Sequence, residues 1–386
     1  MVAIAALNVF RGGAREFVFL VLNLTFVGGM LLSPVGALGT LVFAVMGYGL
    51  VRLAVRRGIG GLALGIALYV AVFVYMSRYE FLEWVVPDSW LTQVLGTVGL
   101  SFLFFKVVHV MIDAYSGTIG RLTFVSYLNY VLNFATFMMG PIQRYQDYRD
   151  QWEGAKQAIP AEFESYLDSA VRVLLGLGKA YVLAPLFQDW ALQPDTALVD
   201  LSLKGFLVQS YAFWAYLYLN FSGYCDVAIG VGSLFGVRPP ENFNRPFLAR
   251  NISDFWQRQH RSLTLWLTDY VFSPTYRFLL SRSGGSRLAA ANLSLMLTMM
   301  VSGLWHGTTL SFFLFGLVHG LWFVLYRSWD ALLVHGLGKS GVKRLRQNVL
   351  AQAGGVFLTF NATALAFVFF QVRPGRFVEY FAAVLQ

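Results

Sequence analysis

Apolar runs of about twenty residues recur along the whole chain, and they limit the possible folds more than any other feature. Hydrophobic residues make up 57% of the 386 residues and charged residues only 13%, against about 45–50% and roughly 25% in a soluble domain. A helix needs a run of this length to cross a bilayer. Because strand edges cannot be satisfied in lipid, we predict an all-α polytopic membrane protein.

The runs give a first estimate of the number of spans. The clear candidates are 17–32, 36–51, 60–77, 91–112, 166–187, 203–219, 288–304, 309–326 and 349–371. Two weaker stretches, 122–141 and 224–237, are short or interrupted, and we interpret them as re-entrant or interfacial segments. We therefore expect about 9–11 transmembrane helices. With no linker or repeat in the sequence, we expect them to form a single domain over residues 1–386.

Charges in the loops indicate how these spans are oriented. Segment 238–287 is rich in arginine, which predicts a cytoplasmic location, whereas segment 78–90 is mostly acidic and is expected outside. This alternation places the N-terminus in the cytoplasm. The net charge of +9 is then explained by span orientation and contact with the lipid bilayer, so we expect no nucleic-acid partner.

Several kinds of site are excluded by the sequence. The single cysteine, Cys225, rules out an internal disulfide and argues against a thiolate metal site. No serine lies in a Gly-x-Ser-x-Gly motif, which excludes that kind of nucleophile. No His-Glu-x-x-His motif is present, so we expect no bound metal. Three Gly-x-x-x-Gly pairs are interpreted as close helix contacts. They are Gly61/Gly65, Gly232/Gly236 and Gly316/Gly320.

His306 is the strongest candidate for a catalytic residue. It lies between two apolar spans in the segment Ser302-Gly-Leu-Trp-His-Gly-Thr, next to Trp305 and between two glycines. Ionisable residues at membrane depth are costly and mark functional sites by default. We expect a neutral His306 that can accept a proton; the alternative is a packing histidine.

His260 is the second candidate. If residues 251–270 form one helix, Trp256 and His260 share a face with Leu263, Leu267 and Tyr270, while arginines lie on the other side. That pattern suits a helix at the membrane interface or one that lines a cavity. It is equally consistent with an amphipathic surface helix whose histidine is simply buried.

The preceding segment, Pro239 to Phe247, is expected to be irregular because its prolines interrupt any helix. Irregular backbone at membrane depth must be surrounded by protein or water, so Glu241, Asn242 and Asn244 are candidates to line a polar cavity. A purely structural turn is the alternative.

The other histidines give weaker signals. His319 lies within a span and is either a packing residue or a partner of the site. For His109, close to Asp113 in sequence, a structural hydrogen bond is favoured. His335 lies in a basic loop and is expected to be solvated.

Taken together, these motifs resemble those of the membrane-bound O-acyltransferase family. The resemblance is to its bacterial branch, which includes the alginate O-acetylation and teichoic-acid D-alanylation membrane proteins. The segments that carry it are Asn220-Phe-Ser-Gly-Tyr-Cys-Asp, Glu241-Asn-Phe-Asn-Arg-Pro-Phe, Asp254-Phe-Trp-Gln-Arg-Gln-His-Arg-Ser-Leu-Thr and Gly303-Leu-Trp-His-Gly. With two upstream motifs, Ser101-Phe-Leu-Phe-Phe-Lys and Gly140-Pro-Ile-Gln-Arg-Tyr, it extends over about residues 98–330. The chain departs from the pattern at Gln259 and Arg261.

The resemblance implies a ring of helices around a central cavity in the bacterial inner membrane. It implies that His306 and His260 are catalytic, and we add Trp305, Asn242, Asn244, Glu241, Trp256 and His319 as substrate-binding residues. No permanently bound cofactor is implied; acetyl-CoA or an acyl carrier protein thioester would supply the acyl group from the cytoplasm. The acceptor would be an envelope glycan or an extracytoplasmic acyltransferase partner.

Two other functions stay open at this point. A transporter of acyl or lipid-linked cargo would also need a polar cavity, although it usually shows repeat symmetry. A non-catalytic scaffold of an envelope acylation complex would not need the histidines.

Overall fold

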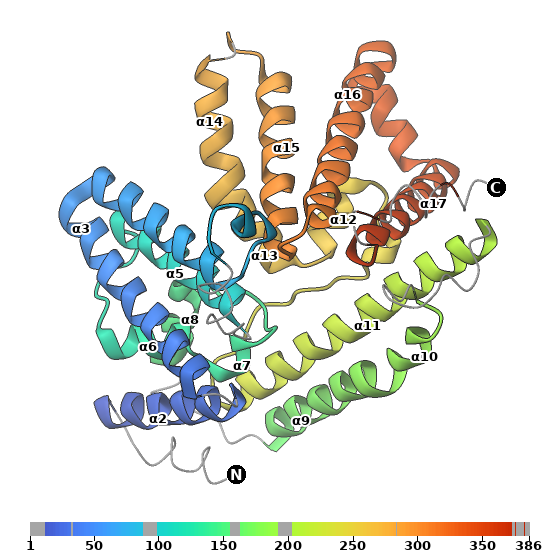
Figure 1. Ribbon diagram of the computed structural model, residues 1–386. Coiled ribbons are helices and arrows are strands. Elements are labelled where there is room, and N and C mark those ends of the chain that lie inside the picture. Colours follow the sequence, from blue (N-terminus) through green and yellow to red (C-terminus); the bar gives the residue numbers. More distant parts are fainter. Residues whose placement is uncertain are drawn as a thin grey trace. The chain divides into compact units, whose positions relative to one another are not determined.

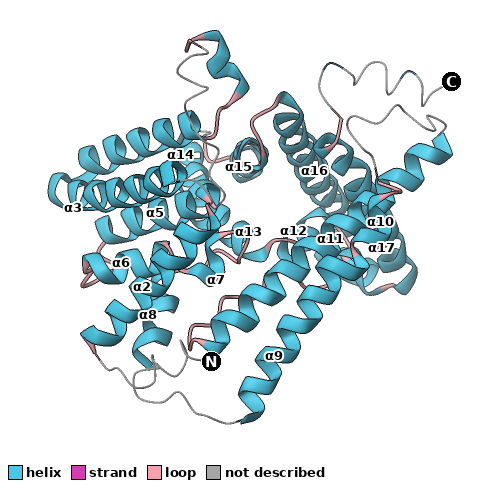
Figure 2. Cartoon of the chain, turned by 60° about the horizontal axis from the view of Figure 1, so that its bottom comes forward, coloured by secondary structure: helices cyan, strands magenta, loops and turns pink. Residues whose placement is uncertain are grey.

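The computed structural model describes residues 12–31, 34–87, 99–154, 163–191, 203–282 and 284–372, with the single positions Gly375 and Ala382. Within these ranges every regular element is a helix, and no strand is present (Figure 2). The all-α prediction is therefore confirmed. Residues 1–11, on which the predicted side of the N-terminus depends, and the start of the 91–112 span lie outside the described residues.

Six helical segments of the described chain are long and apolar enough to cross a membrane. They are Gly13–Met30, Pro34–Met76, Glu164–Gln188, Arg287–His306, Leu310–Gln347 and Val349–Phe370. Pro34–Met76 covers two of the predicted spans, 36–51 and 60–77. Its backbone kinks between them at Gly58, where φ is 64°. A multi-pass membrane protein is thereby confirmed.

The described chain divides into two compact units. The first comprises residues up to Gly178 together with Gly223–Glu241, and the second comprises Lys179–Ser222 and Asn242 onward. Helix α11 (Leu203–Leu234) contributes to both. The single domain that we predicted over residues 1–386 stays a prediction.

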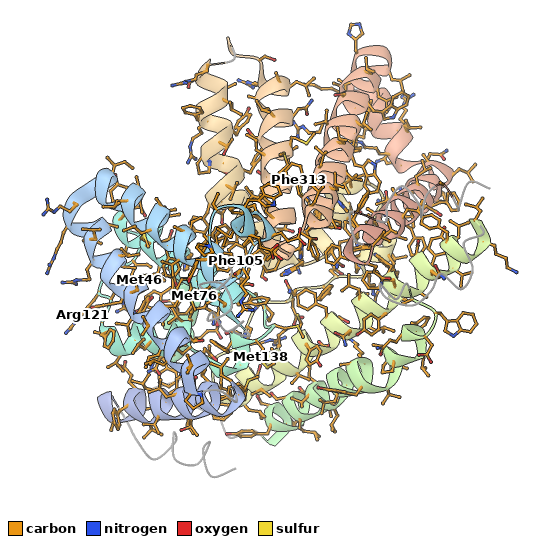
Figure 3. The ribbon with its side chains drawn as sticks, viewed as in Figure 1. Met46, Met76, Phe105, Arg121, Met138 and Phe313 are labelled. Atoms are coloured by element: carbon orange, nitrogen blue, oxygen red, sulfur yellow. The ribbon has the colours of Figure 1, made fainter. Side chains whose placement is uncertain are left out.

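The first unit is built from long helices and several short ones. Its elements are α2 (Gly13–Met30), α3 (Pro34–Met76), η1 (Glu80–Trp84), α5 (Leu100–Tyr115), α6 (Phe124–Val131), α7 (Phe134–Phe137), α8 (Tyr145–Gly154) and α9 (Phe163–Gly178). Helices α3 and α5 pack side by side (Figure 1). Phe105 of α5 lies in the interior of this unit, whereas Arg121 is exposed at its edge (Figure 3). The 122–141 stretch forms the short helices α6 and α7, in agreement with its interrupted apolar pattern.

The second unit carries the predicted catalytic histidines. Its elements besides α11 are η2 (Lys179–Leu183), α10 (Pro185–Gln188), η3 (Pro246–Leu248), α12 (Ile252–Arg258), α13 (Arg261–Leu267), η4 (Thr268–Phe272), α14 (Ser273–Arg282), α15 (Arg287–His306), α16 (Leu310–Gln347), α17 (Val349–Ala366) and η5 (Phe367–Phe370). Residues 237–245, before η3, form no regular element, as the prolines predict.

Helices α15 and α16 run side by side and approach each other through glycines (Figure 1). A Cβ atom added to Gly316 would lie 2.4 Å from the carbonyl oxygen of Met299, and one added to Gly303 would lie 2.3 Å from that of Phe312. A Cβ atom added to Gly320 would lie 2.6 Å from the Met296 sulfur. The Gly316/Gly320 pair is therefore a close helix contact, as predicted, and it fixes the two helices that flank His306.

The predicted continuous helix over residues 251–270 is wrong. Helix α12 ends at Arg258, Gln259 is extended, and His260 has the left-handed conformation, with φ 48° and ψ 49°, before α13 begins. Residues 259–261 include no glycine or proline, so no local pattern predicts this break. Tertiary contacts that hold the start of α13 account for it.

Candidate active site

His260 and His306 lie close together in the second unit. Their ring centroids are 6.5 Å apart, although the residues are far apart in sequence. His306 is the last residue of α15, and His260 immediately precedes α13. The structure therefore brings together the two residues predicted to be catalytic.

The loop after His306 is shaped by a close contact at Gly307. Its φ of −174° is open to any residue, so its backbone does not require glycine. A Cβ atom there would lie only 2.0 Å from the Phe312 ring. Any larger residue at this position would force the Phe312 ring to move, so glycine lets the chain turn from α15 into α16 directly beside the imidazole.

Trp305 completes the cluster around the two histidines. Its ring centroid is 4.6 Å from that of His306 and 5.7 Å from that of His260. Phe370 of η5 and Phe315 of α16 contact His306 from other sides, with centroid distances of 5.1 and 5.7 Å. His306 is only partly buried, so a reactant can reach its imidazole.

His260 is much more enclosed, with 3% of its surface exposed. Its imidazole packs edge-on against Phe221, with centroids 4.8 Å apart, and neither ring nitrogen has a hydrogen-bond partner among the described residues. Burial lowers the pKa of His260 well below its ordinary value, and nearby His306 lowers it further. A neutral imidazole offers one N–H donor and one acceptor, and neither is taken up by another described residue.

Asn242 fixes the backbone on the C-terminal side of His260. Its backbone oxygen accepts a hydrogen bond from the amide of Arg261 at 2.9 Å. Its side-chain Oδ1 accepts from the amide of Ser262 at 3.0 Å and from the Ser262 hydroxyl at 2.9 Å. Asn242 is fully buried, so its position favours holding the His260 turn over direct contact with a substrate.

Asn244 contacts the other side of the same turn through its backbone. Its amide donates to the carbonyl oxygen of Arg258 at 2.9 Å, at the end of α12. The residue is exposed. The segment that was predicted to line a polar cavity thus clamps the ends of α12 and α13, which the sequence did not indicate.

His319 and Trp256 form a second polar pair among aromatic rings. Their centroids are 5.4 Å apart, and the Nδ1 atom of His319 is 3.2 Å from the carbonyl oxygen of Phe315, which fits an N–H donor at Nδ1. His319 Nε2 and Trp256 Nε1 are both buried without a partner in the described chain. Phe315 lies between His319 and His306, since its ring contacts both.

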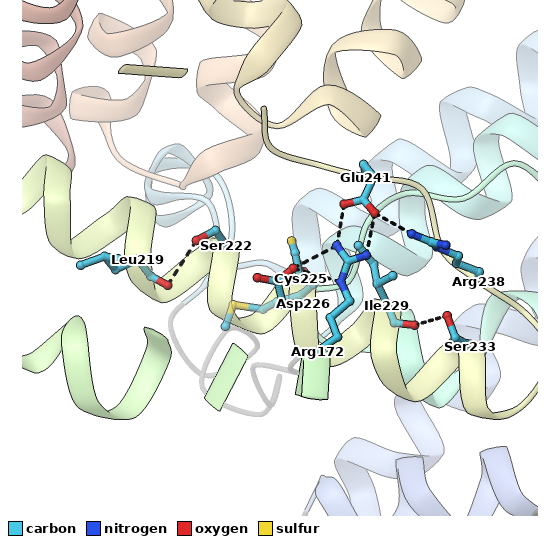
Figure 4. A network of polar contacts seen from close by, with 10 residues as sticks. Arg172, Leu219, Ser222, Cys225, Asp226, Ile229, Ser233, Arg238 and Glu241 are labelled. Carbon is cyan, nitrogen blue, oxygen red and sulfur yellow. Dashed lines mark hydrogen bonds and ion pairs between the residues drawn. The ribbon is translucent and has the colours of Figure 1, made fainter. Parts of the chain in front are cut away.

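Glu241 belongs to the first unit and forms ion pairs there. Arg172 of α9 donates to both carboxylate oxygens of Glu241, at 2.6 and 2.5 Å, and also to Asp226 at 3.0 Å (Figure 4). Arg238 donates to Glu241 at 3.1 Å. The hydrogen bonds from Arg172, above all, hold the pKa of Glu241 below its usual value. The pair of Glu241 and Arg172 was not predicted from the sequence, because 69 residues separate them.

Two buried polar side chains of the first unit have satisfied partners. His109 accepts from the amide of Tyr145 at 2.8 Å and pairs with Asp113 at 3.2 Å, which confirms its structural role. Lys106, which sequence analysis gave no role, donates to the Tyr130 carbonyl oxygen at 3.2 Å and to the Thr136 hydroxyl at 2.8 Å. His335 of the second unit is exposed, as expected, but it lies within helix α16 and not in a loop.

No group of three potential metal ligands gathers within the described ranges. The chemistry of the cluster is that of imidazole and indole groups. It can take up a proton at a partly exposed histidine and offer hydrogen-bond donors from buried rings close by.

Comparison with known proteins identifies the family. Residues 61–335 match the model of MBOAT, the membrane-bound O-acyltransferase family. The teichoic acid D-alanyltransferase of Streptococcus thermophilus is 32% identical over 72% of this chain and 69% of its own length. That of Bacillus subtilis is 27% identical over 78% of this chain and 75% of its own length. The probable alginate O-acetylase of Pseudomonas aeruginosa is 31% identical over 62% of this chain and 44% of its own length.

The family match covers more than half of the chain and includes both catalytic candidates, with the helices that carry them. It agrees with the all-helical architecture and with the membrane spans of the described residues. The chain therefore belongs to the membrane-bound O-acyltransferase family.

Proposed function

We propose that this enzyme transfers an acyl group, acetyl or D-alanyl, from a cytoplasmic thioester to a hydroxyl group of a bacterial cell-envelope glycan, directly or through an extracytoplasmic partner. The names of the relatives support an envelope polymer as the final acceptor. The observation that carries the proposal is the pair of imidazoles, His260 and partly exposed His306, with ring centroids 6.5 Å apart.

In the proposed reaction, His306 acts as the general base. It takes the proton of the acceptor hydroxyl while the hydroxyl oxygen attacks the thioester carbonyl carbon. The resulting tetrahedral intermediate carries a negative oxygen. When that intermediate collapses, the carbon–sulfur bond breaks, and the leaving thiolate takes the proton back from His306. The products are an ester and a free thiol.

His260 is proposed to stabilise the negative oxygen. Its N–H group is buried and has no partner among the described residues, so it need not give up another hydrogen bond to donate. A hydrogen-bond donor held in a site with little water stabilises the transition state far more than a donor in water does. Trp305 contacts both imidazoles and can add a second donor from its indole.

The remaining predicted site residues are proposed to act around this pair. Asn242 and Asn244 hold the turn that presents His260. Trp256 and His319 lie behind Phe315 and shape the inner wall of the site. Glu241 is assigned to the ion pair with Arg172, so direct contact with substrate is not part of its proposed role.

The family match favours acyl transfer over transport of acyl cargo and over a scaffold without activity. The donor is proposed to be acetyl-CoA or a carrier-protein thioester that approaches the arginine-rich segment 238–287 from the cytoplasm. The same charge pattern supports insertion in the inner membrane with this segment inside.

The experiment is His306→Ala in membranes, with His335→Ala as the matched control, because His335 is exposed and far along α16 from the cluster. Envelope glycans from strains with each variant are compared by mass spectrometry. We expect His306→Ala to abolish acylation at normal protein level, and His335→Ala to leave it unchanged. Retained acylation in His306→Ala contradicts the proposal.

A further inference from the structure

The second unit encloses a cavity of about 240 Å³ that contains neither of the paired histidines. Helices α12, α13, η4, α15 and α16 contribute to its wall. Much of the lining is apolar, with Phe272, Leu295, Met299 and Phe323 among its residues. Arg327 is the only charged residue of this lining.

The position of Arg327 along α16 places it near one face of the bilayer. It is the first arginine, lysine or carboxylate of this helix and lies 17 positions after Leu310. At 1.5 Å per residue this is about 26 Å, close to the roughly 30 Å thickness of the hydrocarbon core. A membrane span that begins at Leu310 therefore places the guanidinium at the level of the lipid phosphates.

The charge of Arg327 is not used within the described protein. The side chain is exposed and forms no ion pair or hydrogen bond with any described residue. The two carboxylates nearest to its neighbour Tyr326, Asp330 and Asp254, pair with Arg346 and Arg258 instead. Arg327 is thus available to an external anion.

Trp256 adds to the apolar wall of the same cavity. It is 4% exposed, and its indole N–H has neither an acceptor nor accessible surface in the described part of the chain. The cavity therefore joins an apolar wall to a cation at the bilayer surface.

We propose that this cavity binds one acyl chain of an anionic membrane phospholipid. The phosphate pairs with Arg327, and the hydrocarbon chain lies along Leu295, Met299 and Phe323. The volume favours a single chain over a nucleotide, because it is below the roughly 300–1,000 Å³ of pockets for drug-sized ligands. This lipid site does not depend on the proposed acyl transfer.

The test measures phosphatidylglycerol binding to the full chain in detergent by native mass spectrometry. Arg327→Gln removes the cation, and Leu295→Trp fills the cavity. Arg344→Gln is the matched control, since it makes the same change at an exposed position of the same helix. Arg327→Gln is expected to weaken binding about fivefold, the effect of one arginine at an anionic surface.

We expect one retained lipid in the unchanged protein, weaker binding in Arg327→Gln, none in Leu295→Trp, and no change in Arg344→Gln. Because Arg327 is exposed, its variant remains informative if Leu295→Trp fails to fold. Equal binding by the unchanged protein and Arg327→Gln overturns the proposal. Displacement of the lipid by coenzyme A also overturns it and assigns the cavity to the acyl donor.

Discussion

Replacing His260 by phenylalanine should separate catalysis from stability in this protein. The new ring keeps the edge-on packing against Phe221, now at 4.8 Å, and the contact with Trp305. It also removes two buried nitrogens without partners among the described residues. Each such unpaired group costs about 1–3 kcal/mol, so the substitution removes a penalty.

One opposing effect reduces this gain. Residue 260 has a left-handed backbone, which costs roughly 1–2 kcal/mol for residues with a Cβ atom and is tolerated better by histidine than by most. The unchanged protein already has most of this strain at His260, so the substitution adds little to it. We therefore expect the free energy of unfolding of His260→Phe to be unchanged or larger. Activity should nevertheless fall by about 10²–10³ in kcat, the usual effect of losing one oxyanion donor.

The assay is acyl transfer by the purified enzyme, together with thermal unfolding followed by tryptophan fluorescence. His260→Ala is the comparison, because it removes the same nitrogens but leaves a cavity where the ring packs, at a cost of several kcal/mol. If His260→Phe retains full activity, His260 is not the oxyanion donor. If it loses activity and stability together, its nitrogens have structural partners and the reasoning fails.

Three further results are expected. Gly316→Ala should lower the Tm, because its Cβ would meet the Met299 carbonyl oxygen at 2.4 Å and overpacking costs about 1–3 kcal/mol; Gly354→Ala, in open space on α17, should not. Asn242→Ala should reduce kcat. Asn242→Asp retains an oxygen acceptor for the Ser262 amide and should keep more activity. An equal loss of activity in the two variants contradicts this prediction. The Tm difference between wild type and Glu241→Gln should be the same at about pH 7 and pH 5, since the lowered pKa keeps Glu241 charged, and should shrink only below about pH 4. A difference that stays constant as the pH falls below about pH 4 would show that the pKa of Glu241 is not lowered in the folded state.

The lowered pKa of Glu241 determines how its contribution to stability changes with pH. A carboxylate whose pKa is lower in the folded state stabilises the fold above its unfolded pKa and loses this effect as the pH falls through the folded value. Glu241 is exposed by 43%, so water screens its pair with Arg172 and the effect on Tm should be small.

Apolar patterning predicted the spans because lipid imposes one requirement on every crossing segment. The 288–304 and 309–326 stretches became α15 and α16, with the Trp-His-Gly break between them. Local glycines marked this break. The close approach of Gly303 and Gly307 to residues of α16 explains why glycine occupies those positions.

The local shape around His260 could not be predicted in the same way. The 3.6-residue period continues through 251–270, and no residue there forces a break. The start of α13 is instead held by Asn242, 20 positions earlier in the chain. The partner of Glu241 is still more distant in sequence. Apolar periodicity and helix propensity describe one segment at a time, so they do not predict contacts between distant segments.

The conformation of His260 adds an argument for its role that the sequence alone could not supply. Two unfavourable features meet at this residue, a left-handed backbone and a buried imidazole without partners among the described residues. A glycine would remove the first and an apolar ring the second. Such costs persist where function requires them. Because His306 lies within 6.5 Å and is open to a reactant, the shared requirement that best explains both costs is an imidazole directed at the reacting group.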